Sequence, residues 1–342
     1  MPKVASSLPL SGLFALAKPS GPISMSLVNQ MKPLIMNTRL FVEASKLDNS
    51  QTQQKQKKGR FSRNAVKIGQ GGTLDPLADG VLVIGIGKGT KHLTSLLDCV
   101  KEYRTTALLG CETDTYDSEG SQVRVAPWKH VTREQVENAL EQFRGEIKQA
   151  PPIFSALKMD GKHLYDYARQ GIPLPRPIEK RPVTVHSLEI IEWKGSDHDF
   201  RFPEKKFTEE QKQAVARAMN GIKDQVRVDD EPETEVDNAP NVAPTAFVLK
   251  MKVSGGTYVR SIVHDLGHAV GSAAHVVTLT RSRQGRFALE PTGKDDIGCV
   301  AWEVFAKAAE NPGEPDADGW LEWERKVLDK LEIVEGKEQS GK

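Results

Sequence analysis

The sequence predicts an α+β fold, in which strands and helices alternate irregularly along the chain. Residues 81–84 (VLVI) are apolar without alternation and lie between Gly80 and Gly85, which indicates a strand buried on both faces. Residues 258–270 instead have the length and pattern of a helix. Because the elements do not form a regular series of strand, helix and strand, α+β fits better than a parallel α/β fold.

The other elements have local start and stop signals. Strands are predicted at 102–109, 181–193 and 246–253, and helices at 133–143, 163–170, 208–222, 299–310 and 319–333. Thr132 and Gln135 are spaced as a capping box that begins the first of these helices, and Gly145 lies beyond its end. Gly171 closes the second, because glycine readily adopts the left-handed conformation found after a helix.

The composition is that of an ordinary globular protein, with 38% hydrophobic and 27% charged residues among 342. No apolar run reaches membrane-spanning length, so no membrane partner is expected. Cys99, Cys111 and Cys299 form no C-x-x-C pair, which argues against a disulfide framework or zinc ribbon and for a reducing compartment. His264 and His268 are four apart on a predicted helix, but without a third ligand in the pattern packing is favoured over metal binding.

The net charge of +1 conceals a segregation of charge along the chain. Residues 224–237 carry seven acidic side chains against one basic, and residues 310–335 carry nine against three, which leaves about +13 on the rest of the chain. A basic body suits a polyanion, because Lys and Arg contacts to phosphates release counterions and dominate nucleic-acid affinity. For scattered lysines, plain solvated surface remains the alternative.

Two insertions are expected in the folded body, at about 39–65 and 195–245. The second is rich in Asp, Glu, Lys, Pro and Asn, which predicts a long loop that is helical only in part. Overlapping the first, residues 51–67 hold six Lys or Arg and no acid. This tract fits a nuclear import signal or an RNA-contacting arm as well as a flexible linker, and all three stay open.

Asp75 lies in a loop of defined shape just before the strand at 81–84. Gly71 and Gly72 permit backbone angles that other residues resist, and Pro76 biases Asp75 towards an extended conformation. A carboxylate beside a core needs a cationic or hydrogen-bonding partner, or its pKa rises and it becomes neutral. Local chemistry alone favours a simple turn role for Asp75.

The wider pattern around Asp75 changes that interpretation. The segment GGTLDPLADGVLVIGIGKGTK (71–91) resembles the catalytic motif of the TruB-type tRNA pseudouridine synthases, in which the aspartate of G-T-L-D-P is catalytic. Four further segments stand in the family's order: LAKPSGPIS (16–24), KEYRTTALLGCETDTYDSEG (101–120), PPIFSALKMDGKHLYDYARQG (151–171) and SGGTYVRSIVHDLG (254–267). Five ordered motifs are far more specific than one. The resemblance implies the pseudouridine synthase fold, a mixed, mainly antiparallel sheet with flanking helices and a central cleft.

The same resemblance implies the catalytic roles. Asp75 matches the catalytic aspartate, which either forms a covalent adduct or removes a ribose proton, and both routes stay open. Arg260 matches the active-site arginine, and Asp117 matches that arginine's second acidic partner, so a network from Asp75 through Arg260 to Asp117 is implied. Turning uridine into pseudouridine involves no net redox change, so no cofactor and no metal is expected.

The target base must be flipped out of its stack, which requires a pocket with flat apolar walls. Tyr103 matches the family's stacking tyrosine, Tyr258 a second wall, and Leu279 an apolar pocket residue, although each alone would suggest ordinary packing. Lys18 lies in a Lys-Pro turn that supports the catalytic loop in the family, a role favoured over phosphate contact. Gln70 stands where many relatives have histidine, and it keeps hydrogen bonding without titrating near neutral pH.

By resemblance the substrate is elongator tRNA, at the uridine of its T loop, with mRNA that imitates this loop as a further target. The expected protein is a eukaryotic, fungal, stand-alone monomer of the nucleus or cytoplasm, with a mitochondrial pool left open. Residues 291–342 are expected to extend a catalytic domain of residues 1–290 as an acidic, partly helical segment without a recognisable PUA domain. Two alternatives remain, the catalytic subunit of a guide-RNA-dependent pseudouridylation particle and a non-catalytic tRNA-folding chaperone.

Overall fold

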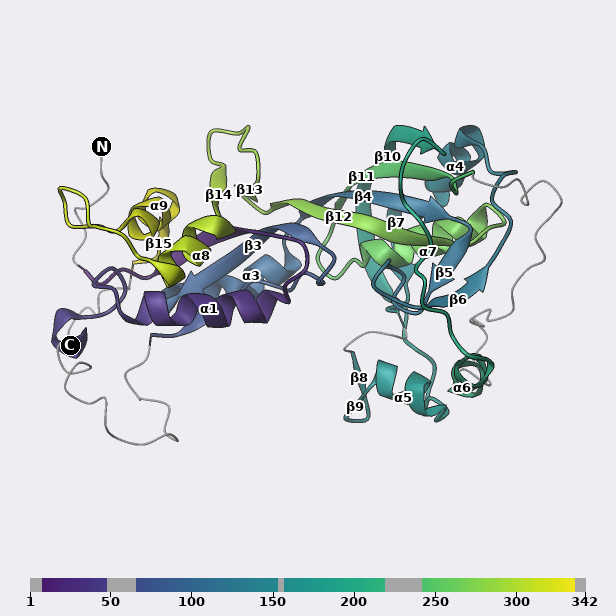
Figure 1. The fold of residues 1–342 in the computed structure, drawn as a ribbon, viewed down its shortest axis with the longest axis horizontal. Helices are drawn as coiled ribbons and strands as arrows, with labels where there is room; N and C mark the ends of the chain where they lie inside the picture. The colour runs from purple at the N-terminus through teal and green to yellow at the C-terminus, as the bar shows by residue number, and fades with distance from the viewer. Residues whose placement is uncertain (1–7, 48–65, 153–156, 219–241, 336–342) are drawn as a thin grey trace. The chain divides into compact units, whose positions relative to one another are not determined.

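The computed structural model describes residues 8–47, 66–152, 157–218 and 242–335, which fall into two compact units (Figure 1). Unit 1 contains residues 1–101 and 281–342, and unit 2 contains residues 102–280. The chain passes between them at the start of β4 (Lys101–Leu109) and again within β12 (Ala274–Gln284). The acidic tract at 224–237 and all but the last two residues of the basic tract at 51–67 lie outside the described residues.

Unit 1 is a sheet with helices on both faces. Its strands lie in the order β2 (Ile68–Gln70), β3 (Asp79–Ile86), β1 (Gly12–Lys18), β14 (Ile297–Ala301) and β13 (Phe287–Ala288), and β15 (Glu332–Ile333) also pairs with β1. One face is covered by α1 (Ser24–Met36), α8 (Trp302–Glu310) and α9 (Glu322–Lys330), and the other by α3 (Leu93–Asp98), which follows the 3₁₀ helix η1 (Gly87–His92). In β3, Leu82 and Ile84 join the first core while Val81 and Val83 join the second. The predicted two-sided burial of residues 81–84 is confirmed.

The C-terminal residues take part in this core. Phe305, Trp320 and Trp323 are buried with the residues of α1. The predicted helices at 299–310 and 319–333 are present but shorter. Residues 297–301 and 332–333 pair with β1 as strands, which delays the start of α8 and ends α9 early, and α9 begins only after Leu321. The sequence-based division at residue 290 therefore falls inside unit 1, between two strands of one sheet.

Unit 2 is built on a second set of strands, with β12 beside β4 and then β11 (Ala246–Val253), β10 (Arg181–Gly195) and β7 (Gly145–Gln149). Two hairpins are formed by β5 (Cys111–Thr113) with β6 (Gln122–Val125) and by β8 (Lys158–Met159) with β9 (Lys162–His163). The helices are α4 (Arg133–Ala139) with the 3₁₀ turn η2 (Leu140–Phe143), α5 (Leu164–Gln170), α6 (Glu209–Ala218) and α7 (Val259–Ala269).

Local signals located these elements well. Thr132 and Gln135 form the predicted capping box at the start of α4, and Gly171 ends α5 with a φ of +60°. Most strand pairings are antiparallel, while β14 is parallel to both β1 and β13, so the predicted mixed, mainly antiparallel sheet with flanking helices is confirmed. The predicted central cleft stays a prediction. Among the described residues, no helix is both long and apolar enough to cross a membrane.

Candidate active site

Asp75 lies in the loop between β2 and β3, and neighbouring side chains hold the backbone of that loop. Ser24 Oγ donates a hydrogen bond to the carbonyl oxygen of Leu74 at 2.8 Å and accepts one from its N–H at 2.9 Å. Ser20 Oγ donates to the carbonyl oxygen of Leu77 at 2.7 Å. The half-buried Asp75 therefore lies in a segment whose backbone is restrained on both sides.

Lys18 is buried beside the same loop, with 2% of its surface exposed. Its Nζ donates to the carbonyl oxygens of Ala78 at 2.6 Å and Pro19 at 2.9 Å. Burial lowers the pKa of the Lys18 ammonium from its ordinary value, while the carboxylates of Asp79 and Asp75 act to raise it. An amine directed at buried carbonyl oxygens fits the predicted supporting role better than phosphate contact.

Arg281 is a further support that the sequence analysis did not identify. Its Nη1 donates to the carbonyl oxygen of Thr73 at 3.3 Å, so it contacts the Asp75 loop directly. The Arg281 backbone passes so close to Gly80 that a Cβ there would lie 2.2 Å from its carbonyl oxygen, and Gly80 also has a φ of +105°. Ser20 and Ser24 were overlooked as well, although both belong to the LAKPSGPIS motif.

Gln70 lies at the end of β2, opposite Ile84 of β3. Its side-chain Oε1 is buried and has no hydrogen-bond partner within the described part of the chain. A buried acceptor that stays unsatisfied costs about 1–3 kcal/mol.

In unit 2, Arg260 and Asp117 form the predicted ion pair. Arg260 Nη1 lies 3.6 Å from Asp117 Oδ2, and the two side chains are only 10% and 5% exposed. The same Nη1 donates to the carbonyl oxygen of Thr115, whose hydroxyl donates to Asp117 Oδ1 at 2.6 Å. The Glu119 N–H also donates to this oxygen, at 3.2 Å. Asp75 belongs to unit 1, and its pairing with Arg260 stays a prediction.

The three predicted base-binding residues also lie in unit 2. Tyr103 on β4 and Leu279 on the neighbouring strand β12 are 8% and 6% exposed. Tyr258 immediately precedes α7. The Gln149 amide holds the Tyr258 backbone, since Nε2 donates to its carbonyl oxygen at 2.8 Å and Oε1 accepts from its N–H at 2.7 Å. The sequence analysis did not single out Gln149, although it stands two residues before the PPIFSALK segment.

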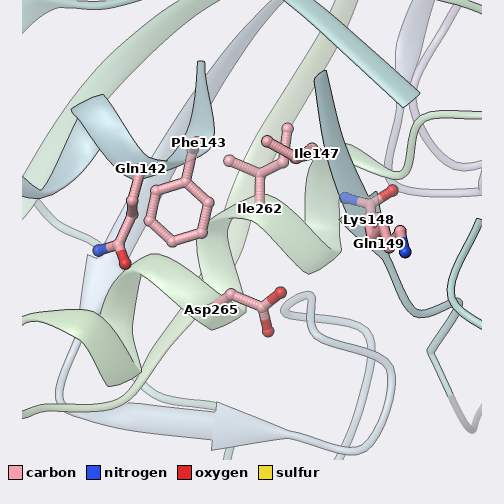
Figure 2. A pocket seen from close by; sticks show the side chains of 7 residues that line it. All are labelled: Gln142, Phe143, Ile147, Lys148, Gln149, Ile262 and Asp265. Atoms are coloured by element: carbon pink, nitrogen blue, oxygen red, sulfur yellow. The ribbon is translucent and has the colours of Figure 1, made fainter. Parts of the chain in front are cut away.

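A pocket of about 100 Å³ lies beside Gln149 (Figure 2). It is lined by Gln142, Phe143, Ile147, Lys148, Gln149, Ile262 and Asp265. Figure 2 shows the apolar side chains of Phe143, Ile147 and Ile262 beside one another, with Gln142 on one side of them and Gln149 on the other. Because none of the predicted base-binding residues lines it, this pocket is not the predicted uridine site.

A buried carboxylate, Glu112, lies between His264 and His268. The Nε2 atoms of the two histidines are each 2.9 Å from a Glu112 oxygen. Arg124 Nε is 3.3 Å from Oε2 of the same carboxylate. The sequence showed no third ligand near the two histidines because Glu112 is 152 residues away from His264.

Comparison with known proteins decides the family. Residues 58–209 match the family model for the N-terminal domain of TruB family pseudouridylate synthases. The chain is 37% identical over 361 residues to tRNA pseudouridine synthase 4 of Schizosaccharomyces pombe, which covers 91% of this chain and 84% of that protein. The chain belongs to the TruB family. As a eukaryotic-type TruB member it is an RNA pseudouridine synthase, an isomerase, and the predicted family is confirmed.

Two further relatives, from budding yeast and mouse, agree with this membership. This TruB-family chain is 35% identical to tRNA pseudouridine synthase 4 of Saccharomyces cerevisiae, over 82% of this chain and 78% of that protein. It is 36% identical to pseudouridylate synthase TRUB1 of Mus musculus, over 83% of this chain and 66% of that protein. Among solved structures, a chain of a Cbf5-Nop10-Gar1 complex matches with a TM-score of 0.49 and 21% identity, and the match covers 94% of this chain and 60% of that one.

Proposed function

We propose that this enzyme converts the T-loop uridine of elongator tRNA to pseudouridine, acting alone as a monomer. RNAs that imitate the T loop, mRNA among them, are further substrates. The observation that carries the proposal is Asp75, presented by a loop whose backbone is held by Ser20, Ser24, Lys18 and Arg281. Relatives named tRNA pseudouridine synthase 4, at 35% and 37% identity, support tRNA as the substrate.

Asp75 is assigned the role of nucleophile or base at the junction of ribose and base. The bond from C1′ to N1 breaks, the detached uracil rotates, and a bond from C1′ to C5 forms. C5 then loses its proton and N1 gains one, so the product is an isomer of the substrate. Asp75 acts in its ionised form, either adding to the sugar or removing a ribose proton. Arg260 stabilises that carboxylate, because a guanidinium presents a planar fork of donors that can bridge two carboxylates, here Asp75 and Asp117.

Tyr103, Tyr258 and Leu279 are proposed to hold the flipped uracil while it is detached. Stacking on an aromatic ring is worth about 1–3 kcal/mol per base, which offsets part of the cost of flipping. The Gln149 amide keeps the Tyr258 backbone in place. Gln70, which stands where many relatives have histidine, is proposed to contact the target loop through its amide.

Release of tritium from C5 of the T-loop uridine tests the proposal. Purified protein is incubated with an unmodified tRNA transcript, without metal, nucleotide or guide RNA. The parent is expected to release tritium and Asp75→Ala to lose at least about 1,000-fold in rate, a typical cost of removing a group on which the reaction depends. Asp329→Ala, an exposed aspartate of α9, is the matched control and should keep the parent's rate.

The alternatives give different results in the same assay. Release that requires an added guide RNA would indicate the guide-dependent particle. No release from the parent, combined with faster refolding of tRNA, would indicate the folding chaperone. Location in the nucleus or cytoplasm is a separate proposal, tested by imaging a tagged chain.

A further inference from the structure

Glu112 on β5 is a buried carboxylate surrounded by cationic side chains. It is 1% exposed, and Arg124 lies opposite it on β6. Burial disfavours its charged form, yet the charge and hydrogen bonds of His264 and His268 hold the pKa of Glu112 well below its usual range. Burial also opposes protonation of His264, but the Glu112 carboxylate raises the pKa of that imidazole to about 9. Glu112 is therefore ionised, with imidazolium and guanidinium partners.

His264 in turn supports Tyr116. The two rings stack with centroids 3.8 Å apart and an interplanar angle of 18°. The ring of His264 is fixed at both nitrogens, since Nε2 faces Glu112 at 2.9 Å and Nδ1 faces Asp265 at 2.8 Å. Tyr116 has a φ of +63°, a left-handed conformation that is unfavourable for residues other than glycine unless the surroundings hold it. The stacked imidazolium supplies such a restraint.

Tyr116 stands between the two groups that contact Arg260. The turn at Tyr116 brings the Thr115 carbonyl oxygen and Asp117 Oδ2 to the same atom, Nη1 of Arg260. The backbone of Val276 on β12 forms two hydrogen bonds with this turn. Its carbonyl oxygen accepts from the Ser118 N–H at 2.9 Å, and its N–H donates to the Tyr116 carbonyl oxygen at 3.0 Å.

Helix α7 carries both the histidine that stacks on Tyr116 and the arginine that contacts Thr115 and Asp117. His264 follows Arg260 by four residues, so the two side chains lie one turn apart on the same face of the helix. One turn of α7 thus contacts the ring of Tyr116 while the preceding turn contacts the residues on either side of it.

We propose that Glu112 and His264 are positioning residues for the Asp117–Arg260 pair and act through Tyr116. The carboxylate of Glu112 orients the imidazolium, the imidazolium holds the Tyr116 ring, and the left-handed turn then presents Thr115 and Asp117 to Arg260. The inference rests on the proposed function, which places Arg260 at the catalytic aspartate.

A divalent metal bound by Glu112, His264 and His268 is the competing interpretation, because their ligand atoms lie within 4.8 Å of one another. Arg124 argues against it, since its Nη2 lies 3.5 Å from His268 Nε2 and its Nε 3.3 Å from Glu112. The charges of Arg124 and protonated His264 already balance those of Glu112 and Asp265. A metal ion would add two positive charges beside a fixed cation.

A double-mutant cycle tests the proposal by single-turnover tritium release from T-loop-labelled tRNA. His264→Ala and Asp117→Ala are each expected to lower the rate constant by about 10- to 100-fold, the scale of a small misplacement of catalytic groups. The double variant should react no more than about two-fold slower than Asp117→Ala alone, because both changes disrupt the same Asp117–Arg260 pair. The Kd for tRNA should stay within about three-fold of the parent. His186→Ala, an exposed histidine on β10, is the matched control.

The proposal would be overturned if the fold losses in rate constant of the two single variants multiply in the double variant. It would also be overturned if only the Kd for tRNA changes. Tyr116→Phe keeps the stacked ring and should keep the rate. Tyr116→Gly removes the ring that His264 holds, and glycine is not confined to the left-handed conformation, so the turn is no longer fixed. It should lose rate as His264→Ala does, and it replaces that variant if His264→Ala does not fold. One equivalent of zinc in the purified parent, absent from His264→Ala, would overturn the proposal in favour of the metal site. Failure of the proposed function is distinct, since Asp75→Ala would then release tritium like the parent or the parent would release none.

Discussion

Gly80→Ala is expected to destabilise unit 1 and to displace the support of the Asp75 loop. The new Cβ would lie 2.2 Å from the carbonyl oxygen of Arg281 and 2.9 Å from its backbone nitrogen, so backbone has to move. Overpacking of this kind costs about 1–3 kcal/mol. A further cost of about 1–2 kcal/mol comes from placing alanine at a φ of +105°.

Gly21→Ala separates the cost of the steric clash from the cost of the positive φ. Gly21 has the same φ of +105°, but a Cβ there would meet nothing within 4 Å. Urea denaturation should therefore show a loss of about 1–2 kcal/mol in the free energy of unfolding for Gly21→Ala and about 2–5 kcal/mol for Gly80→Ala. Equal losses in the two variants would refute the close approach of Arg281 to Gly80.

Three more predictions test individual contacts. Ser24→Ala removes the hydroxyl that hydrogen-bonds both backbone groups of Leu74. It should lower the single-turnover rate by about ten-fold and leave the tRNA Kd unchanged. An unchanged rate would contradict the claim that Ser24 restrains the Asp75 loop. Gln149→Ala should lower the rate, and Gln149→Glu, which keeps the acceptor for the Tyr258 N–H, should lower it less. Equal losses in rate would argue that the Gln149 hydrogen bonds do not position Tyr258. The pKa of His264 is raised to about 9 in the folded protein, so its stabilisation is full below pH 6.5 and is lost as the pH rises through 9. Denaturation across this range should show the stability gap between parent and His264→Ala shrinking by about 3 kcal/mol, and a constant gap would argue against the imidazolium.

Signals that act over a few residues were sufficient for much of the fold. The capping box of Thr132 and Gln135 and the left-handed Gly171 need only their own helix, so the sequence predicts where α4 begins and α5 ends. The unbroken apolar run at 81–84 likewise predicts a strand between two cores. The start of α8 and the end of α9 were wrong by a few residues, because residues 297–301 and 332–333 form strands only where β1 is present to pair with them.

In the candidate site, too, residues within motifs could be predicted, whereas residues whose partners are distant in the sequence could not. The motifs predicted Arg260 and Asp117 as partners, and the structure brings them together. Glu112 and Arg281 escaped notice because a buried carboxylate and a buried guanidinium have no periodic signature, and their partners lie far away in the sequence. Gln149 was missed since a glutamine at a strand end suggests nothing until Tyr258 is placed beside it.

Pseudouridine formation by an Asp75→Asn variant is the most direct test of the central claim. The asparagine keeps the size of the side chain but cannot act as a nucleophile or as a base. Parent and variant are each incubated with an unmodified tRNA transcript. Because pseudouridine has the same mass as uridine, it is first cyanoethylated, which adds mass to pseudouridine only, and is then counted at the T-loop position by mass spectrometry while tRNA binding is measured in parallel. We expect about one pseudouridine per tRNA from the parent and none from the variant, at equal affinity for tRNA. Equal conversion by the two proteins would contradict it.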